Sequence, residues 1–111
     1  MTNEHKRRLA DNEALFREVN ERVNEQADAH GNDGHVYAYF CECSRPGCVE
    51  RVHHTSAEYE LIRADGARFI LVAGHQIDEI EEVVARMDDS VVVEKQGVAG
   101  DRAEALDPRA V

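Results

Sequence analysis

All three cysteines of this 111-residue chain lie in one eight-residue stretch, Cys41-Glu42-Cys43-Ser44-Arg45-Pro46-Gly47-Cys48. Cysteine thiolates are common ligands of Zn²⁺, which takes four tetrahedral ligands in structural sites. The Arg45-Pro46-Gly47 sequence predicts a turn that brings Cys48 back toward the other two thiols. The stretch therefore predicts a zinc knuckle in which Cys41, Cys43 and Cys48 supply three ligands.

The fourth ligand must come from elsewhere, and the chain has six histidines. His75 is the first candidate because it follows Gly74 in a predicted loop, and loops carry binding residues more often than element interiors do. His53 and His54 are the alternative. They are adjacent on a predicted strand, so they point to opposite faces and at most one of them could reach the site. A water molecule or a carboxylate is the third possibility.

The cysteine count also bears on the compartment. An odd number of cysteines, in a chain that starts with charged rather than apolar residues, disfavours a disulfide framework and favours a metal site or thiol chemistry. No apolar run approaches the roughly 18 residues that a bilayer span needs. We therefore expect a cytoplasmic location and no membrane association.

If the hydrophobic core is small, the stability of the fold depends more strongly on a bound metal ion. Residues 98–111 contain few large aliphatic side chains, and we expect them to be a disordered tail. Residues 1–97 then form a single zinc-stabilised α+β domain, and the balance of apolar burial against chain entropy is near zero for domains this small. A structural zinc ion contributes roughly 10–16 kcal/mol of apparent binding free energy in zinc-finger peptides. We therefore expect Zn²⁺ to have a structural role.

Helical periodicity predicts a long N-terminal helix over residues 4–27, ended by the Gly- and Asn-rich residues 30–34. Its apolar side chains form a narrow stripe, made of Leu9, Leu15, Phe16, Val19 and Val23. A stripe this narrow indicates that the helix packs on its own domain or pairs with a second copy.

Apolar and β-branched runs predict the strands. Residues 36–40 and 69–72 are expected to be buried strands, with residues 49–54 returning as the antiparallel partner of the first. Residues 79–87 fit either a helix or a strand, and we favour a strand paired with residues 91–95.

Thr55 and Glu58 have the spacing of a capping box, which starts a second, short helix. The expected fold is therefore α+β, with a long N-terminal helix, a small antiparallel or mixed sheet carrying the zinc knuckle, and one further short helix.

The net charge of −10 is unevenly distributed. Residues 76–97 contain two basic and seven acidic side chains and so carry −5 of it. This balance disfavours nucleic-acid binding, which draws on Lys and Arg to neutralise phosphates. An acidic face keeps a small protein in solution, or it docks a basic partner. We expect a protein partner at the acidic segment 78–94 or at the N-terminal helix.

A wider pattern lies between Arg8 and Lys95. It comprises Arg8-Leu9-Ala10-Asp11-Asn12-Glu13, Phe16-Arg17-Glu18-Val19-Asn20-Glu21-Arg22, Phe40-Cys41-Glu42-Cys43, Cys48-Val49-Glu50-Arg51-Val52, Glu58-Tyr59-Glu60, Arg63-Ala64-Asp65 and Gly74-His75. In these stretches the chain resembles a family of small, uncharacterised bacterial proteins. Members carry cysteine at the three positions and a Gly-His pair further on. The resemblance implies His75 as the fourth ligand and implies no activity.

These observations predict a zinc-binding interaction or regulatory module rather than an enzyme. Catalytic zinc keeps an open position and usually has His or carboxylate ligands, whereas three thiolates in one loop are typical of a closed structural site. The sequence has no Gly-rich phosphate loop, no Gly-x-Ser-x-Gly and no His-Glu-x2-His. The alternatives, in order, are a thiol redox or zinc-release sensor and a metal-dependent enzyme.

Overall fold

The computed structural model describes residues 1–29, 34–45, 47–87 and 89–109. The helices are α1 (Asn3–Ala29), α2 (Ser56–Arg63) and α3 (Gly97–Ala105), and the strands are β1 (Val36–Phe40), β2 (Arg51–Thr55), β3 (Arg68–Val72), β4 (Glu81–Met87) and β5 (Ser90–Lys95). β1 and β2 form one antiparallel pair, and the other three strands form an antiparallel sheet in the order β3-β5-β4. The expected α+β class is confirmed, with two small sheets instead of one.

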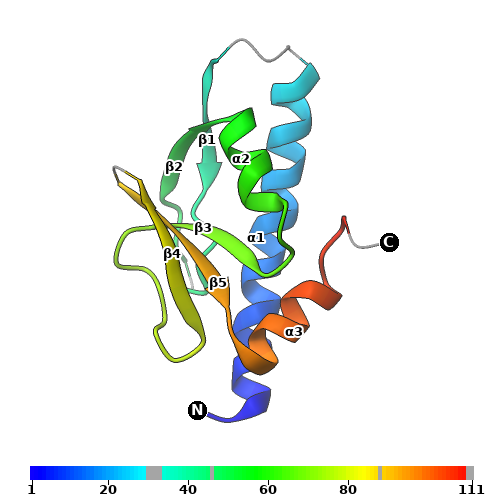
Figure 1. The fold of residues 1–111 in the computed structure, drawn as a ribbon, viewed down its shortest axis with the longest axis vertical. Helices are drawn as coiled ribbons and strands as arrows, with labels where there is room; N and C mark the ends of the chain where they lie inside the picture. Colours follow the sequence, from blue (N-terminus) through cyan, green and yellow to red (C-terminus); the bar gives the residue numbers. More distant parts are fainter. Residues whose placement is uncertain (30–33, 46, 88, 110–111) are drawn as a thin grey trace.

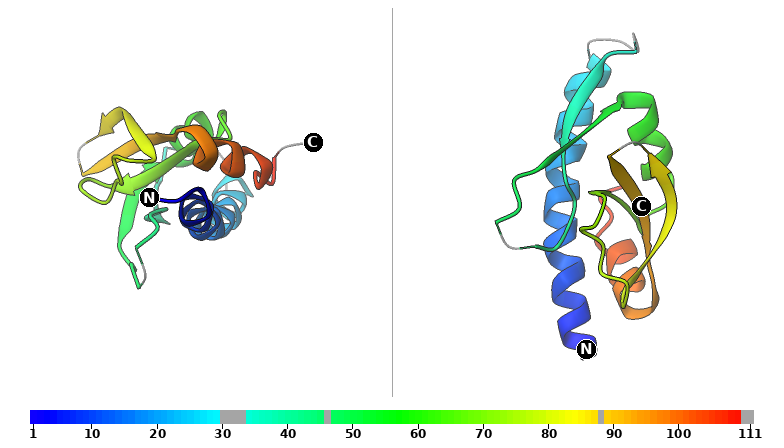
Figure 2. Two further views of the ribbon diagram at one scale, coloured as in Figure 1. Left: turned by 90° about the horizontal axis from the view of Figure 1, so that it is seen from below. Right: turned by 90° about the vertical axis from the view of Figure 1, so that its left-hand side faces the viewer.

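The long helix α1 runs along the length of the molecule (Figure 1). The three-stranded sheet, α2 and α3 all lie on the same side of it (Figure 2, left). Its most extensive contacts are with α3, β1 and α2, so the helix packs on its own domain.

The buried face of α1 is not the predicted apolar stripe. Leu15 and Val19 remain 62% and 42% exposed. The buried positions recur at helical spacing and are mostly polar: Ala10, Glu13, Arg17, Asn20, Asn24 and Ala27. This face meets carbonyl groups and side-chain polar groups of distant segments, which polar side chains satisfy and apolar ones would not. The stripe prediction is therefore wrong for Leu15 and Val19.

Apolar side chains pack on both faces of the three-stranded sheet. One face carries Phe69, Leu71, Val91 and Val93, which pack with Cys41, Cys43 and Ala103. The other face carries Ile70 and Val92, which pack with Tyr39, Val52, Tyr59 and Ile62. Because alternate residues of a strand face opposite sides, β3 and β5 contribute to both layers.

Two local predictions are confirmed. The Thr55 side chain accepts a hydrogen bond from the backbone of Glu58 while the Glu58 carboxylate accepts one from the backbone of Thr55, so the capping box starts α2. Residues 81–87 form a strand paired with β5, with a register shift between Val83 and Ala85. β1, expected to be buried on both faces, is covered only in part, since Val36 is 60% exposed.

The prediction that residues 98–111 are a disordered tail is wrong for its first part, because Gly97–Ala105 forms helix α3. Ala99 and Ala103 are fully buried, and α3 packs along α1. The same small side chains that indicated disorder allow the helix to approach its neighbours closely. At Gly100, an added Cβ would lie only 2.6 Å from the Lys95 carbonyl oxygen. The folded part of the chain therefore extends beyond residue 97.

Some predicted features lie partly outside the described residues, namely the helix-ending residues 30–33, the proline of the 45–47 turn, residue 88 between β4 and β5, and residues 110–111. Within the described part of the chain, no helix has both the length and the apolar character that crossing a membrane requires.

Candidate metal centre

Cys41, Cys43, Cys48 and His75 converge, and their ligand atoms all lie within 4.8 Å of one another. The His75 Nδ1 is 3.6 Å from the Sγ of Cys41 and 3.7 Å from the Sγ of Cys48. In a tetrahedral zinc site, Zn–S and Zn–N bonds of about 2.3 and 2.0 Å place sulfur and nitrogen about 3.5 Å apart. The donor set and its spacing therefore fit a four-coordinate metal ion.

A neighbouring carboxylate orients the His75 ring. The Nε2 of His75 lies 2.8 Å from the Oε2 of Glu50. Because a carboxylate only accepts hydrogen bonds, this contact places a ring proton on Nε2, and in the neutral ring the Nδ1 lone pair then faces the sulfur atoms. Carboxylates commonly orient metal-binding histidines in this way.

The loop that carries His75 is held by backbone contacts. The His75 amide donates to the Val72 carbonyl at 3.0 Å. The Arg45 guanidinium donates to the Gly74 carbonyl at 3.0 Å, which ties this loop to the cysteine stretch. Gly74 has a φ of +96°, a conformation that favours glycine. The backbone conformation of this loop thus favours glycine at position 74, and His75 supplies the candidate ligand.

The cysteine loop connects β1 to β2 and continues their pairing for one further step. The Cys41 amide donates to the Glu50 carbonyl at 3.0 Å. On its other side, the Cys41 Sγ accepts a hydrogen bond from the Val72 amide at 3.2 Å. The thiol group is therefore positioned by a strand of the other sheet, and the centre lies where the two sheets meet.

The centre is largely shielded from solvent. Cys41 and Cys43 are each 1% exposed, while Cys48 and His75 are half-buried. Burial raises the pKa of both the Cys41 and the Cys43 thiol. Reactive cysteines have a lowered pKa instead. A bound cation at the centre would favour the thiolate forms.

The alternative histidine ligands lie elsewhere. The ring of His54 is buried and its Nε2 is 3.1 Å from the Ser90 Oγ. His53 is exposed on the opposite face of β2. Among the histidines that the structure describes, His75 is the one that joins the cysteines.

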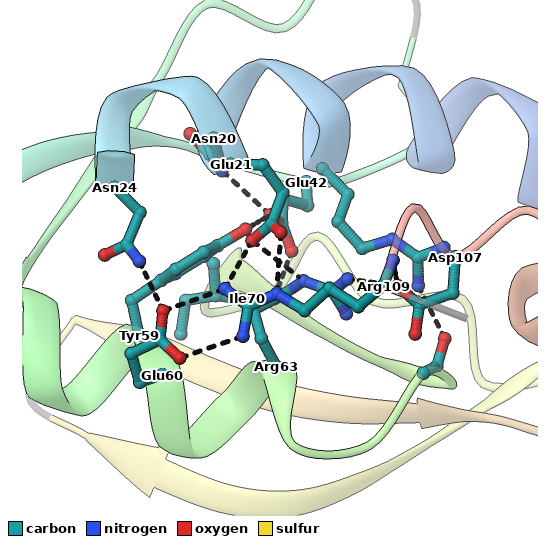
Figure 3. Close-up of polar contacts among 12 residues, drawn as sticks. Asn20, Glu21, Asn24, Glu42, Tyr59, Glu60, Arg63, Ile70, Asp107 and Arg109 are labelled. Atoms are coloured by element: carbon teal, nitrogen blue, oxygen red, sulfur yellow. Dashed lines mark hydrogen bonds and ion pairs between the residues drawn. The ribbon is translucent and has the colours of Figure 1, made fainter. Parts of the chain in front are cut away.

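The residue between Cys41 and Cys43 belongs to a second polar cluster, the Glu42 cluster, which comprises Glu42, Asn20, Tyr59 and the Ile70 amide (Figure 3). The fully buried Glu42 carboxylate accepts hydrogen bonds from the Asn20 amide at 2.9 Å, the Tyr59 hydroxyl at 2.7 Å and the Ile70 amide at 3.0 Å. Burial raises the pKa of Glu42, although these donors oppose the shift. The cluster joins α1, α2 and β3 around one side chain.

Ion pairs surround the Glu42 cluster and reach the C-terminal segment (Figure 3). The buried Arg63 guanidinium bonds to Glu21, at 3.2 Å, and to Asp107. Arg109 bonds to Glu21 and Glu60 at 2.6 and 2.8 Å. These contacts fix the segment after α3 against α1 and α2.

Sequence reasoning missed the Glu42 cluster. Polar residues on a helix ordinarily indicate its solvent face. The available signal was the recurrence of Glu13, Arg17, Asn20 and Asn24 at steps of four, three and four, which places them on one face.

A scan against models of known protein families, a search of curated proteins and a search of solved structures each found no match to this chain. The assignment of the candidate metal centre therefore rests on its geometry and donor chemistry.

Proposed function

We propose that this chain is a small zinc-binding protein in which Cys41, Cys43, Cys48 and His75 hold a structural ion, and that the domain stabilised in this way serves as an interaction or regulatory module. The observation that carries the proposal is the convergence of the four donor atoms within 4.8 Å. The orientation of the His75 ring by Glu50 supports it independently.

The donor set favours zinc over other metals. Three sulfur donors and one imidazole suit a borderline-soft, tetrahedral ion, whereas Mg²⁺ and Ca²⁺ require oxygen donors. With all four positions filled by protein, no position is left for a substrate, which favours a structural role over a catalytic one.

The position of the centre explains what such an ion would stabilise. Cys41 and Cys43 belong to the same apolar cluster as Phe69 and Leu71 of β3. An ion held by these cysteines and by His75 would join the β1–β2 loop to the β3–β4 loop. Because binding to a site absent from the unfolded chain adds to folding free energy, loss of the ion would loosen both sheets.

The test combines native mass spectrometry with thiol titration on the purified full chain. We expect one zinc ion per chain and three protected cysteines, and we expect Cys43→Ser to lose both the ion and the cooperative unfolding transition. His5→Ala, which alters an exposed histidine outside the centre, serves as the matched control. A folded, metal-free protein with three freely reactive thiols would overturn the proposal. Release of zinc by mild peroxide would instead favour the thiol-sensor alternative.

A further inference from the structure

An apolar groove of about 330 Å³ lies between α2 and the β4–β5 hairpin. Leu61 lines it from α2 and Val84 from β4, with Val92 of β5 between them. Leu61 is 77% exposed and Val84 is 38% exposed, so large apolar side chains face solvent on both sides. Surface apolar residues that line a shared concavity are typical of recognition sites.

The sheet leaves the groove open on its β4 side. At the opposite edge, β3 is closed, because the Ile70 carbonyl and amide both bond to Glu42 and the Val72 amide bonds to Cys41. β4 is the other edge strand. In the described chain, the hydrogen bonds of residues 82–86 run only to β5.

An irregularity in β4 adds to the apolar lining. The register with β5 shifts between Val83 and Ala85, so Val84 has no partner opposite it. Val84 and Ala85 consequently both line the groove, although consecutive strand residues ordinarily face opposite sides. Bulges of this kind re-aim side chains and occur often next to functional sites.

Charged side chains of both signs lie at the groove, and the acidic ones are in excess. A row of charges crosses the sheet beside it, where Arg68 faces Glu94 and Glu94 faces Glu82. Glu58 of α2 and Arg68 of β3 both line the groove. Three carboxylates against one guanidinium give this rim an acidic character, and the hairpin belongs to the stretch that carries half of the net charge.

From this complementarity we infer that the groove binds a segment of a partner protein in which aliphatic residues are flanked by Lys or Arg. The aliphatic side chains would lie against Leu61, Val84 and Val92, and the basic residues against the acidic rim. The inference rests on the proposed function as an interaction module and names its surface and the chemistry of its partner.

Two synthetic nonapeptides test the inference. Both carry the same core of aliphatic residues alternating with threonine, and they end either in lysines or in glutamates. We expect the lysine-ended peptide to bind the zinc-loaded full chain in fluorescence anisotropy, with affinity that falls as salt is raised. We expect the glutamate-ended peptide not to bind. Leu61→Glu should weaken binding at least about tenfold, whereas Leu15→Glu, an exposed leucine on α1, should leave it unchanged.

Each contrary outcome is decisive. Absence of binding up to about 1 mM, by a chain that mass spectrometry shows to hold zinc, would overturn the groove proposal and leave the metal proposal standing. Peptide binding by a folded chain without zinc would overturn the metal proposal and leave the groove proposal standing. Equal loss of binding in Leu61→Glu and Leu15→Glu would place binding elsewhere. A dimer in solution that Leu61→Glu abolishes would assign the groove to a second copy and overturn the peptide proposal.

Discussion

The carboxylate of Glu50 and the imidazole of His75 form a pair 2.8 Å apart, although Glu50 is 57% exposed at its side chain and His75 only 15%. We expect Glu50→Ala to lower zinc affinity about 10–100-fold, because the ring loses the partner that fixes its orientation and tautomer. Competition with a chromogenic chelator measures this change. Glu25→Ala, an exposed carboxylate on α1, is the control, and equal affinities in the two variants would contradict the assigned role of Glu50.

The Glu42 carboxylate depends on three donors, one of which is the Tyr59 hydroxyl. Removing that hydroxyl in Tyr59→Phe leaves a buried carboxylate with one bond fewer, and we expect a loss of about 1.5–3 kcal/mol in the free energy of unfolding. Urea unfolding of the zinc-loaded chain measures it. Tyr37→Phe, at a half-buried tyrosine outside the cluster, should change stability by less than about 0.5 kcal/mol. Similar losses in both variants would refute the special role of Tyr59.

Glu13 lies in a fully buried group with Lys95 and Glu81. Burial raises the pKa of Glu13 well above its ordinary value of 4.5, while Lys95 opposes the shift and Glu81 adds to it. The native state therefore holds this proton more tightly than the unfolded state. The contribution of Glu13 to stability is present below the ordinary pKa and is lost as pH rises through the raised one.

We expect Glu13→Gln to remove this contribution. The stability of the variant relative to the natural chain should rise as the pH increases from the ordinary pKa of 4.5 through the raised pKa of Glu13. Urea unfolding across this range measures the difference. Glu18→Gln, at an exposed position of the same helix, should show no such slope. A flat difference for Glu13→Gln would show that its proton is not held in the folded state.

Gly100 tests whether α3 is packed as described. Replacing glycine by alanine inside a helix ordinarily stabilises it by about 0.5–1 kcal/mol. Here the new Cβ would lie 2.6 Å from the Lys95 carbonyl oxygen, so we expect Gly100→Ala to cost about 1–3 kcal/mol instead. Thermal or urea unfolding gives the sign. The neighbouring exposed Asp101→Ala is the control, and a stabilised Gly100→Ala would indicate that α3 does not lie against β5.

Features set by neighbouring residues could be predicted from the sequence. The capping box at Thr55 and Glu58, the β4–β5 pairing and the grouping of the three cysteines each depend on spacing within a few residues. His75 could be selected because glycine precedes it in a loop between apolar segments. In each case the local chemistry admits few conformations.

Features set by distant contacts could not be predicted. Arg17 is buried because it donates to the carbonyls of Gly66 and Ala103, which lie 49 and 86 residues away in the chain. The polar spacing that Arg17 shares with its neighbours on α1 places them on one face, but it does not show that distant carbonyl groups will cover that face. Leu15 and Val19 were predicted to be buried and are exposed for the same reason. Whether a helix face is buried depends on which distant segments pack against it. The family resemblance, the cytoplasmic location and the partner stay predictions.

The single residue between Cys41 and Cys43 has a consequence for how this loop tolerates change. Successive side chains there alternate, with the two thiols directed to the candidate metal centre and Glu42 to the helices. An insertion or deletion of one residue would exchange the two sides and place a carboxylate where a thiol is needed. The spacing of this stretch is therefore constrained on both sides, by the candidate metal centre on one side and by α1 and α2 on the other. A point substitution in this stretch can affect one side alone, whereas an insertion or deletion disrupts the candidate metal centre and the Glu42 cluster together.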